Sequence, residues 1–378
     1  MLRPRILQIG KHFYPDVGGI ETVTRNISDA LQSVEIGADV LCMALHSAGD
    51  RQEAGYRVMR CRSNAVLAGN KTFSWNYVRK VGQLSAHYDV GVLHVPNPLG
   101  AAAVLAGWRK PLILLWHADF DHQVLGKVTR ALDIAIARRA DAIVAPTSVH
   151  LTASNRGPHL VPKGEVIPFP FAPQPARKEG FSSPLVDRIR QSARDRRVVL
   201  AAGRLVPYKG FDVLIRAMEL VGEDLYCVIA GGGPIRDALE RQIDAAGMGD
   251  KVVVTGQIAD DDMAALVDLA HFGCLPSVTA QEMYGLTQVE MMAAGKPVVS
   301  TSLAGSGVPL VNRDGETGLL ARPGDVEDLA RQLAALVSDG ALYRRLAEGA
   351  AQAFRDEYSL RSVGERYASL IQRLTSRG

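Results

Sequence analysis

The sequence predicts an α/β protein built from two doubly wound parallel sheets, and three observations support this. The chain has 378 residues, of which 47% are hydrophobic and 22% charged, a length typical of two domains rather than one core. Short apolar runs alternate with amphipathic helical stretches, as in sheets covered by helices on both faces. The alternation stops near the middle of the chain and then starts again.

In the first half, six apolar runs read as strands: RILQIG, ADVLCMAL, DVGVLHV, LILLWH, DAIVAP and EVIPF. The stretch from Pro168 to Pro184 follows, and we interpret its proline-rich, polar sequence as an interdomain linker. Five further runs then read as strands: RVVLAAG, LYCVIAG, KVVVTG, FGCLPS and KPVVST. Ligands of such sheets bind beyond the carboxyl ends of the strands, so two domains of this kind are expected to face one another across a cleft.

The C-terminal segment reads as a helix with one apolar face. Its apolar positions follow helical spacing and are Leu360, Val363, Tyr367, Leu370 and Leu374. We therefore expect three parts, namely residues 1–172, residues 173–358 and a final helix over 359–378.

Composition narrows the class of protein. No run approaches about 20 apolar residues, and the N-terminus passes into a strand without a signal-peptide pattern, so we expect a cytoplasmic protein. The four cysteines show no metal-ligand spacing and are expected to be reduced and buried: Cys42, Cys61, Cys227 and Cys274. We expect no nucleic-acid partner.

Two glutamates eight positions apart are the most informative feature. Glu282 lies in a predicted loop, Glu290 lies in a predicted helix over 286–294, and Gly295 should end that helix before a strand over 296–300. The first amides of a helix lack internal partners and attract anions, so a phosphate fits near Gly285 and Leu286. The glutamates then suit sugar hydroxyls on either side of a phosphate, which predicts a nucleotide-sugar site. The alternative is that both are ordinary solvated side chains.

This E-x7-E pattern, with its helix and strand, resembles the donor-site motif of glycosyltransferase family 4, whose members are retaining enzymes of the GT-B fold. The resemblance implies two Rossmann-like domains and a last helix that crosses back to the N-terminal domain. It places Glu282 near the transferred sugar and Glu290 near the ribose. It also places the intervening residues at the donor, with tyrosine where phenylalanine is common: Met283, Tyr284, Gly285 and Leu286.

Two further strings resemble family motifs. In YPDVGGIE, Gly18 and Gly19 let the backbone approach a ligand before a helix from about Glu21, although a simple turn explains them equally well. The resemblance implies that their amides face the donor diphosphate or the acceptor. In GRLVPYKG, Arg204 offers a planar fork and Lys209 a mobile point charge, a pair suited to two phosphates.

A glycine-rich turn follows the strand LYCVIAG. Gly231, Gly232 and Gly233 fail the dinucleotide pattern, because Arg236 stands at its last position, and they also fail the P-loop pattern. The resemblance implies a donor-side loop. Gly256 and Gln257, after the next strand, are then candidates to hold the base.

His94 and His117 end two predicted strands of the first half. The WHAD string resembles the segment that places a histidine and an acidic residue against the transferred sugar, which implies His117 first and Asp119 second. A metal site is the alternative, because DFD matches a D-x-D pattern and a ligand set is at hand: His117, Asp119, Asp121 and His122. The family resemblance favours no metal and no cofactor.

Residues 1–172 contain 19 Lys and Arg against 13 Asp and Glu, whereas the remainder contains 24 against 27. The basic half suits an anionic acceptor or an anionic membrane surface. Residues 73–84 and 124–139 mix basic with apolar residues, which fits either ordinary helix packing or peripheral membrane binding.

The strings LHVPNPLG, LLWHADFD and SGVPLVNRDGETG are similar to those of bacterial mannosyl- and rhamnosyltransferases of polysaccharide assembly. The resemblance implies a retaining transfer of mannose or rhamnose from a GDP-sugar to a saccharide or lipid-linked acceptor. In such a transfer the donor's phosphate oxygen assists removal of the acceptor proton. A UDP-sugar transferase, a nucleotide-sugar epimerase on the same fold and a non-catalytic nucleotide-sugar sensor remain alternatives.

Overall fold

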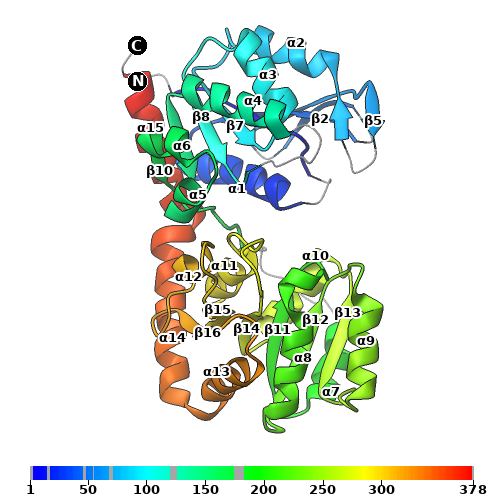
Figure 1. Cartoon of the computed structure of the whole chain (residues 1–378). Helices are drawn as coiled ribbons and strands as arrows, with labels where there is room; N and C mark the ends of the chain where they lie inside the picture. The colour runs from blue at the N-terminus through cyan, green and yellow to red at the C-terminus, as the bar shows by residue number, and fades with distance from the viewer. Residues whose placement is uncertain are drawn as a thin grey trace. The chain divides into compact units, whose positions relative to one another are not determined.

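The computed structural model describes residues 3–14, 18–45, 48–53, 55–67, 71–119, 126–173 and 183–376. The chain forms two compact units (Figure 1). The first consists of Met1–Ala172 together with Glu357–Gly378, and the second of Pro173–Asp356. Each unit is an α/β domain with its own sheet, as the alternating apolar runs predict.

The first unit contains an eight-stranded sheet in the order β10-β9-β8-β7-β1-β2-β4-β3, parallel except where β3 meets β4. Its strands are β1 (Ile6–Ile9), β2 (Ala38–Met43), β3 (Gly49–Gln52), β4 (Arg57–Cys61), β7 (Val90–Val95), β8 (Leu112–Trp116), β9 (Ala142–Ala145) and β10 (Gly164–Val166). A separate antiparallel pair comprises β5 (Ala65–Leu67) and β6 (Lys71–Phe73). All six predicted strands are present. After β1, successive strands are added first on one side of it and then, from β7 onward, on the other. The gap between β1 and β7 is thus a topological switch point, the position where such sheets bind ligands.

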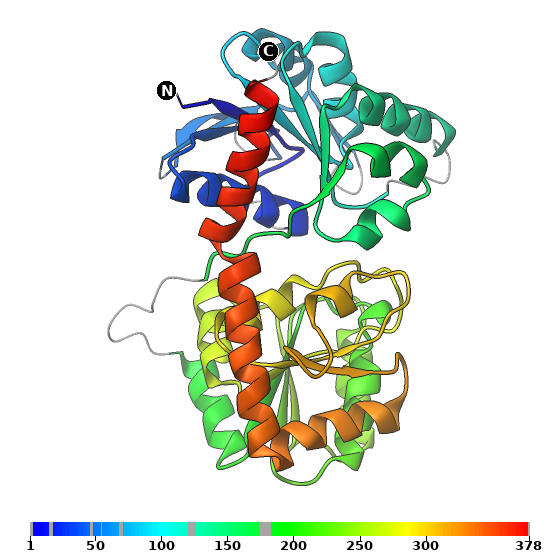
Figure 2. The ribbon, with the colours of Figure 1, turned by 90° about the vertical axis from the view of Figure 1, so that its left-hand side faces the viewer.

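Helices cover this sheet: α1 (Gly19–Ser33), α2 (Trp75–Leu84), α3 (Pro98–Gly107), α4 (Gly126–Arg139), α5 (Ser148–Thr152), α6 (Gly157–Leu160) and α15 (Leu360–Thr375). The last helix packs against α1 (Figure 2). A Cβ at Gly364 would lie 2.2 Å from the backbone oxygen of Ala30, so the two helices approach closely because this residue is glycine. The predicted apolar face of α15 is buried from Val363 onward, whereas Leu360 is half-buried.

Part of the predicted linker is structured within the first unit. Residues 167–170 are buried, Asn26 donates a hydrogen bond to the backbone oxygen of Pro170 (2.9 Å), and Phe171 forms a β-bridge with Ser359. At the other end, Pro184 begins a helix whose N-cap is Ser183. The predicted interdomain linker over 168–184 was therefore too wide, because residues 168–171 pack within the first unit and Pro184 already belongs to that helix. Residues 174–182 lie outside the described part of the chain.

The second unit contains a six-stranded parallel sheet in the order β13-β12-β11-β14-β15-β16. Its strands are β11 (Arg197–Ala202), β12 (Leu225–Ala230), β13 (Val252–Gly256), β14 (Phe272–Leu275), β15 (Val298–Thr301) and β16 (Gly318–Ala321). Its helices are α7 (Pro184–Ala193), α8 (Phe211–Leu220), α9 (Arg236–Ala245), α10 (Asp260–Leu269), α11 (Leu286–Ala293), α12 (Val308–Val311), α13 (Val326–Ser338) and α14 (Gly340–Ala353). The five predicted strands are confirmed. In this sheet the strand order switches sides between β11 and β14. That topological switch point is the expected ligand site.

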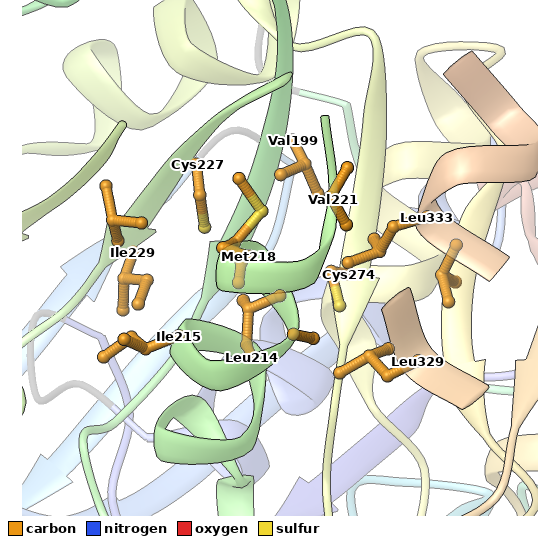
Figure 3. Packing of buried hydrophobic residues seen from close by; sticks show 14 of the residues in the cluster. Val199, Leu214, Ile215, Met218, Val221, Cys227, Ile229, Cys274, Leu329 and Leu333 are labelled. Atoms are coloured by element: carbon orange, nitrogen blue, oxygen red, sulfur yellow. The ribbon is translucent and has the colours of Figure 1, made fainter. Parts of the chain in front are cut away.

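The core of the second unit lies between the sheet and helices α8 and α13 (Figure 3). Leu214 and Met218 of α8 pack with Leu333 of α13 over strand residues such as Cys227 and Cys274. All four cysteines are free and buried, as predicted. In the part of the chain that the structure describes, no helix is long and apolar enough to cross a membrane.

Candidate active site

A buried ion pair lies at the switch point of the second sheet, between the loops that follow β11 and β14. Lys209 ends a single 3-10 turn (Pro207–Lys209) after β11, and Glu282 lies in the loop after β14. Lys209 Nζ contacts Glu282 Oε2, and the two side chains are only 11% and 10% exposed. Ser277 Oγ donates a 3.2 Å hydrogen bond to the same carboxylate oxygen. Two residues that the sequence assigned to phosphate and to sugar are therefore direct neighbours.

Glycines bring these two loops together. Gly210 has φ 68°, a left-handed conformation that favours glycine, and a Cβ there would lie 2.1 Å from the backbone oxygen of Pro276. The loops are also joined by a hydrogen bond from the Val278 amide to the Tyr208 carbonyl (2.8 Å). The side chain of Lys209 passes over Gly203, where a Cβ would lie 3.3 Å from Nζ. The close loop contact directs Lys209 toward Glu282.

Hydroxyl side chains at the end of β15 and in the segment after it hold the Glu282 loop. Ser306 Oγ donates to the backbone oxygen of Glu282, and the Gly307 amide donates to the Met283 carbonyl (2.9 Å). Thr301 Oγ1 donates to the Ser277 carbonyl (2.6 Å). Sequence reasoning missed Thr301 and Ser306, and the only signal for them was small hydroxyl residues directly after a predicted strand.

Helix α11 begins as predicted behind this loop. Its N-cap, Gly285, has φ 72° and provides no side-chain cap, so the first amides of the helix are not occupied by a capping side chain. Met283 and Leu286 are half-buried, whereas Tyr284 is 5% exposed and belongs more to the core than to an open surface. Gly295, with φ 67°, follows the helix end as expected.

Glu290, the fifth residue of α11, is half-buried and lines a small apolar pocket with Leu200, Ala202 and Met291. Burial, together with the negative charge of Asp260, raises the pKa of its carboxyl group to about 7. A carboxyl group held in this way gains from hydrogen-bond donors, because they stabilise its charged form.

Other predicted donor residues surround these loops in different ways. Arg204 is exposed, and its side chain has no hydrogen-bond or ion-pair partner among the described residues. Gly231 has φ 145°, and a Cβ there would lie 1.9 Å from the Gly203 oxygen, so this glycine serves the contact between loops. Gly232 makes only ordinary contact with the side chain of Gln257, which is exposed. Gly232 and Gln257 therefore present accessible surface.

In the first unit, His94 and His117 lie at the ends of neighbouring strands β7 and β8 and contact each other. His94 Nδ1 is 3.1 Å from His117 Nε2, and the rings stack with centroids 5.3 Å apart. The ring of His117 also stacks on Phe169 at 4.9 Å. Burial lowers the pKa of His94 to about 3, and burial with smaller effects of His94 and His150 lowers the pKa of His117 well below 6.5. Both imidazoles are neutral near pH 7.

Asp119 is engaged by the protein itself. Its Oδ1 accepts hydrogen bonds from Trp116 Nε1 (3.2 Å) and Ser154 Oγ (2.5 Å). Its Oδ2 accepts from the Asn155 amide (2.9 Å) and lies 3.5 Å from Arg156 Nη1. These contacts tie the segment after β8 to the start of α6. The structure thus shows Asp119 as an anchor of the loop that carries His117, and among the described residues it makes no hydrogen bond to that histidine.

The glycine pair before α1 is placed differently from the expectation. The helix begins at Gly19, two residues before the predicted start, with Gly18 as an extended N-cap. A Cβ at Gly18 would lie 2.2 Å from Glu21 Oε2, whereas nothing lies within 4 Å of a Cβ at Gly19. The carboxylate of Glu21 therefore covers Gly18, and Gly19 is exposed.

The alternative metal site cannot be built from described residues. Asp121 and His122 lie outside them, and within the described ranges no group of three or more His, Cys, Asp or Glu side chains is arranged to hold a metal ion.

Comparison with known proteins follows the same division into two domains. Residues 18–170 match the family described as "Glycosyl transferase 4-like domain", and residues 184–353 match "Glycosyl transferases group 1". D-rhamnosyltransferase WbpZ of Pseudomonas aeruginosa is 30% identical over 84% of this chain and 83% of its own. O-antigen chain mannosyltransferase C of Escherichia coli is 26% identical over 98% of both chains.

The fold has close counterparts among solved structures. The crystal structure of HepE from Anabaena, in complex with UDP, is 21% identical and covers 98% of this chain and all of that chain, with a TM-score of 0.76. Two Rossmann-like α/β domains, the paired glycosyltransferase matches and full-length bacterial transferase relatives agree with one another. The chain is a GT-B hexosyltransferase and belongs to glycosyltransferase family 4.

Proposed function

We propose that this enzyme transfers mannose or rhamnose, with retention of configuration, from a GDP-sugar to a saccharide or lipid-linked acceptor of cell-surface polysaccharide. The observation that carries the proposal is the buried Lys209–Glu282 pair at the switch point of the second sheet. The names of the two relatives, a D-rhamnosyltransferase and an O-antigen mannosyltransferase, support the choice of sugar and of acceptor class. A UDP-sugar donor is the alternative.

The proposed donor site uses cations and backbone amides of the second unit. Lys209 exchanges Glu282 for a donor phosphate, and exposed Arg204 binds the same diphosphate with its planar fork. The uncapped start of α11 adds helix amides. Glu282, released from Lys209, accepts a hydrogen bond from a hydroxyl of the hexose, and Glu290 accepts from the ribose hydroxyls. Gly232 and Gln257 offer surface for the base.

In the proposed reaction, the acceptor oxygen forms a bond to the anomeric carbon on the face from which the diphosphate leaves. The bond between that carbon and the phosphate oxygen breaks, and the acceptor proton passes to the departing phosphate. No protein base takes part. The protein lowers the barrier by positioning the substrates and offsetting the charge that develops on the diphosphate.

The first unit contributes His117 in this proposal. A neutral imidazole accepts a hydrogen bond from a hydroxyl of the transferred hexose, and Asp119 positions the loop that carries it. The exposed amide at Gly19 is the candidate of the glycine pair for contact with donor or acceptor. Metal ions are not required, since Arg204 and Lys209 supply the positive charge.

Peripheral contact with an anionic membrane is proposed for the first unit. Trp75 at the start of α2 is 68% exposed and stacks edge-on against Phe73, with ring centroids 4.8 Å apart. On α4, Val128 is 66% exposed between exposed Lys127 and Arg130. An aromatic and a basic apolar surface of this kind suits the interface of an anionic bilayer. Cosedimentation with anionic vesicles tests it, and equal binding by wild type and a Trp75→Ala, Lys127→Ala variant would refute it.

The test of the proposed function measures acceptor-dependent release of nucleoside diphosphate from GDP-mannose and from UDP-glucose, using cell-surface glycan as acceptor. We expect GDP release that requires the acceptor, together with a new α-linked product. Isomerised nucleotide-sugar without release would identify an epimerase. Binding without turnover would identify a sensor, and release from UDP-glucose alone would establish the other donor.

A further inference from the structure

A buried chain of hydrogen bonds ends at His117. It starts at Gln8, a polar residue in the otherwise apolar strand β1, and passes through His94 at the end of β7. β1 pairs with β7, and β7 pairs with β8, which His117 follows. Gln8 is fully buried and His94 is 1% exposed. The proposed function uses only the last member of this chain.

The orientation of the Gln8 amide follows from its neighbours. A backbone carbonyl only accepts hydrogen bonds, so the Gln8 atom 3.0 Å from the Thr24 carbonyl oxygen is the nitrogen Nε2. That nitrogen also donates a hydrogen bond to Ser28 Oγ at 2.6 Å. The Ser28 hydroxyl in turn donates a hydrogen bond to the Ala38 carbonyl at 3.2 Å. Oε1 of Gln8 is therefore the acceptor on the other side.

This acceptor determines the protonation of His94. Its Nε2 lies 2.8 Å from Gln8 Oε1 and must carry a proton to form that bond. Burial keeps His94 neutral by lowering its pKa to about 3, so Nδ1 has a lone pair. Thr24 Oγ1 is 3.2 Å from Nδ1 but donates its proton to the Ile20 carbonyl at 2.8 Å. The lone pair of His94 Nδ1 is therefore left to accept a hydrogen bond from His117.

The same reasoning extends to His117. Its Nε2 lies 3.1 Å from the acceptor His94 Nδ1, so Nε2 carries the proton. In a neutral ring the other nitrogen, Nδ1, then bears a lone pair. Among the described residues Nδ1 has no hydrogen-bond partner, and His117 is 8% exposed.

We propose that Gln8, acting through His94, is a positioning residue that fixes His117 in the Nε2-protonated tautomer and so presents Nδ1 as an acceptor to a hydroxyl of the transferred hexose. The inference rests on the proposed function for its substrate, and on the hydrogen-bond chain alone for its tautomer.

The tautomer is measured without turnover. In protein with ¹⁵N-labelled histidine rings, long-range ¹H–¹⁵N correlation spectra distinguish protonated from unprotonated ring nitrogens, and His94→Asn and His117→Asn spectra assign the signals. We expect Nε2–H for both residues in the wild type. Gln8→Met removes the acceptor of His94 Nε2, so both rings should shift toward Nδ1–H. Ser28→Ala is the matched control, because Gln8 keeps its bond to the Thr24 carbonyl. A wild-type His117 protonated at Nδ1 would overturn the inference by itself.

Kinetics test the consequence. Gln8→Met should lower kcat/KM about tenfold, the usual loss for one misdirected hydrogen bond, while Ser28→Ala should stay within about twofold of wild type. In a His117→Ala background, Gln8→Met should cause no further loss. Independent, additive losses from the two substitutions would overturn the inference while leaving the transferase intact. Absence of transfer from every donor would instead contradict the proposed function, and the spectra distinguish the two failures because they need no substrate.

Discussion

Lys209 and Glu282 form an ion pair at the switch point of the second sheet, and both side chains are nearly buried. Such a pair holds two charges in position at a cost in desolvation, and removing one partner leaves the other buried and uncompensated. When an anionic ligand binds Lys209, the Glu282 carboxylate loses its partner and can accept a hydrogen bond from a hydroxyl group. Binding of the diphosphate and recognition of the sugar are thereby coupled.

Replacement of Lys209 should impair both activity and stability. Lys209→Met leaves the Glu282 carboxylate without its cation, and we expect kcat/KM to fall by a factor of about 10² or more, the typical effect of losing one group that stabilises the transition state. Lys251→Met is the matched control, because Lys251 is also buried in the second unit but bonds to the Val221 carbonyl at the other end of the strands. Steady-state kinetics and urea unfolding of both variants check this. Equal losses of activity in the two variants would refute a specific role for Lys209.

The two glutamates of the E-x7-E motif should differ in kinetic effect. Glu282→Gln should lower kcat, because its carboxylate lies beside the phosphate-binding lysine, whereas Glu290→Gln should mainly raise the KM for the donor. Each lost hydrogen bond to a charged group is expected to cost about 1.5 to 3 kcal/mol. Initial-rate measurements over a range of donor concentrations separate the two effects, and near wild-type kinetics in both variants would eliminate the proposed site.

The raised pKa of Glu290 predicts a pH dependence of donor binding. Ribose hydroxyls donate to the ionised carboxylate, so affinity for GDP-mannose should rise as pH increases through about 7 in the free enzyme. Asp260→Asn removes the neighbouring negative charge and should move this rise to lower pH. Calorimetric titration over roughly pH 5.5 to 8, the range around this pKa, checks both curves. A rise that persists unchanged in Glu290→Gln would show that another group titrates.

Stability should change in the opposite sense over part of this range. The folded carboxyl group of Glu290 holds its proton to about pH 7, whereas its ordinary value is 4.5, so the folded state binds more protons between these values. The free energy of unfolding should therefore decrease as pH rises from 4.5 to 7 on account of this residue. Urea unfolding of Glu290→Gln should lack that component. An identical pH dependence in the variant and the wild type would contradict the assignment.

Turnover should persist in excess EDTA. The charge of the leaving diphosphate is met in our proposal by Arg204, Lys209 and helix amides rather than by a bound ion. The informative control pairs chelation with Asp119→Asn and Asp121→Asn. If EDTA abolishes turnover, Mn²⁺ restores it and these substitutions remove the response, then the D-x-D interpretation is right and our charge assignment is wrong.

The fold was largely predictable, because buried parallel strands appear as continuous apolar runs. Five strands escaped for local reasons: β3, β4, β5, β6 and β16. Strand β3 is exposed throughout, and β5 and β6 have only three residues each. In β4, Arg57 and Arg60 interrupt the apolar pattern, since this strand lies near the edge of its sheet. Strand β16 is only four residues long, Gly318–Ala321, too short for its apolar character to distinguish it from a loop.

The site was predictable where residues sit in motifs with fixed spacing. The resemblance of these motifs assigned Lys209, Glu282 and Glu290 to one donor site, and the structure brings Lys209 and Glu282 into contact. Contacts between loops distant in sequence were not predictable. Nothing in the local sequence shows that Ser306 holds the backbone of Glu282, or that Gln8 bonds to His94. Asp119 was expected against the transferred sugar, and its four protein donors, which come from Trp116 and from residues 154–156, were not foreseen.

The exchange of partners at Lys209 is tested most directly by an experimental structure of the enzyme with intact GDP-mannose. We predict that Lys209 Nζ leaves Glu282 and lies about 3 Å from a phosphate oxygen, while the Glu282 carboxylate accepts a hydrogen bond from a hexose hydroxyl. A complex in which Lys209 remains bonded to Glu282, with the diphosphate bound elsewhere, would contradict the account.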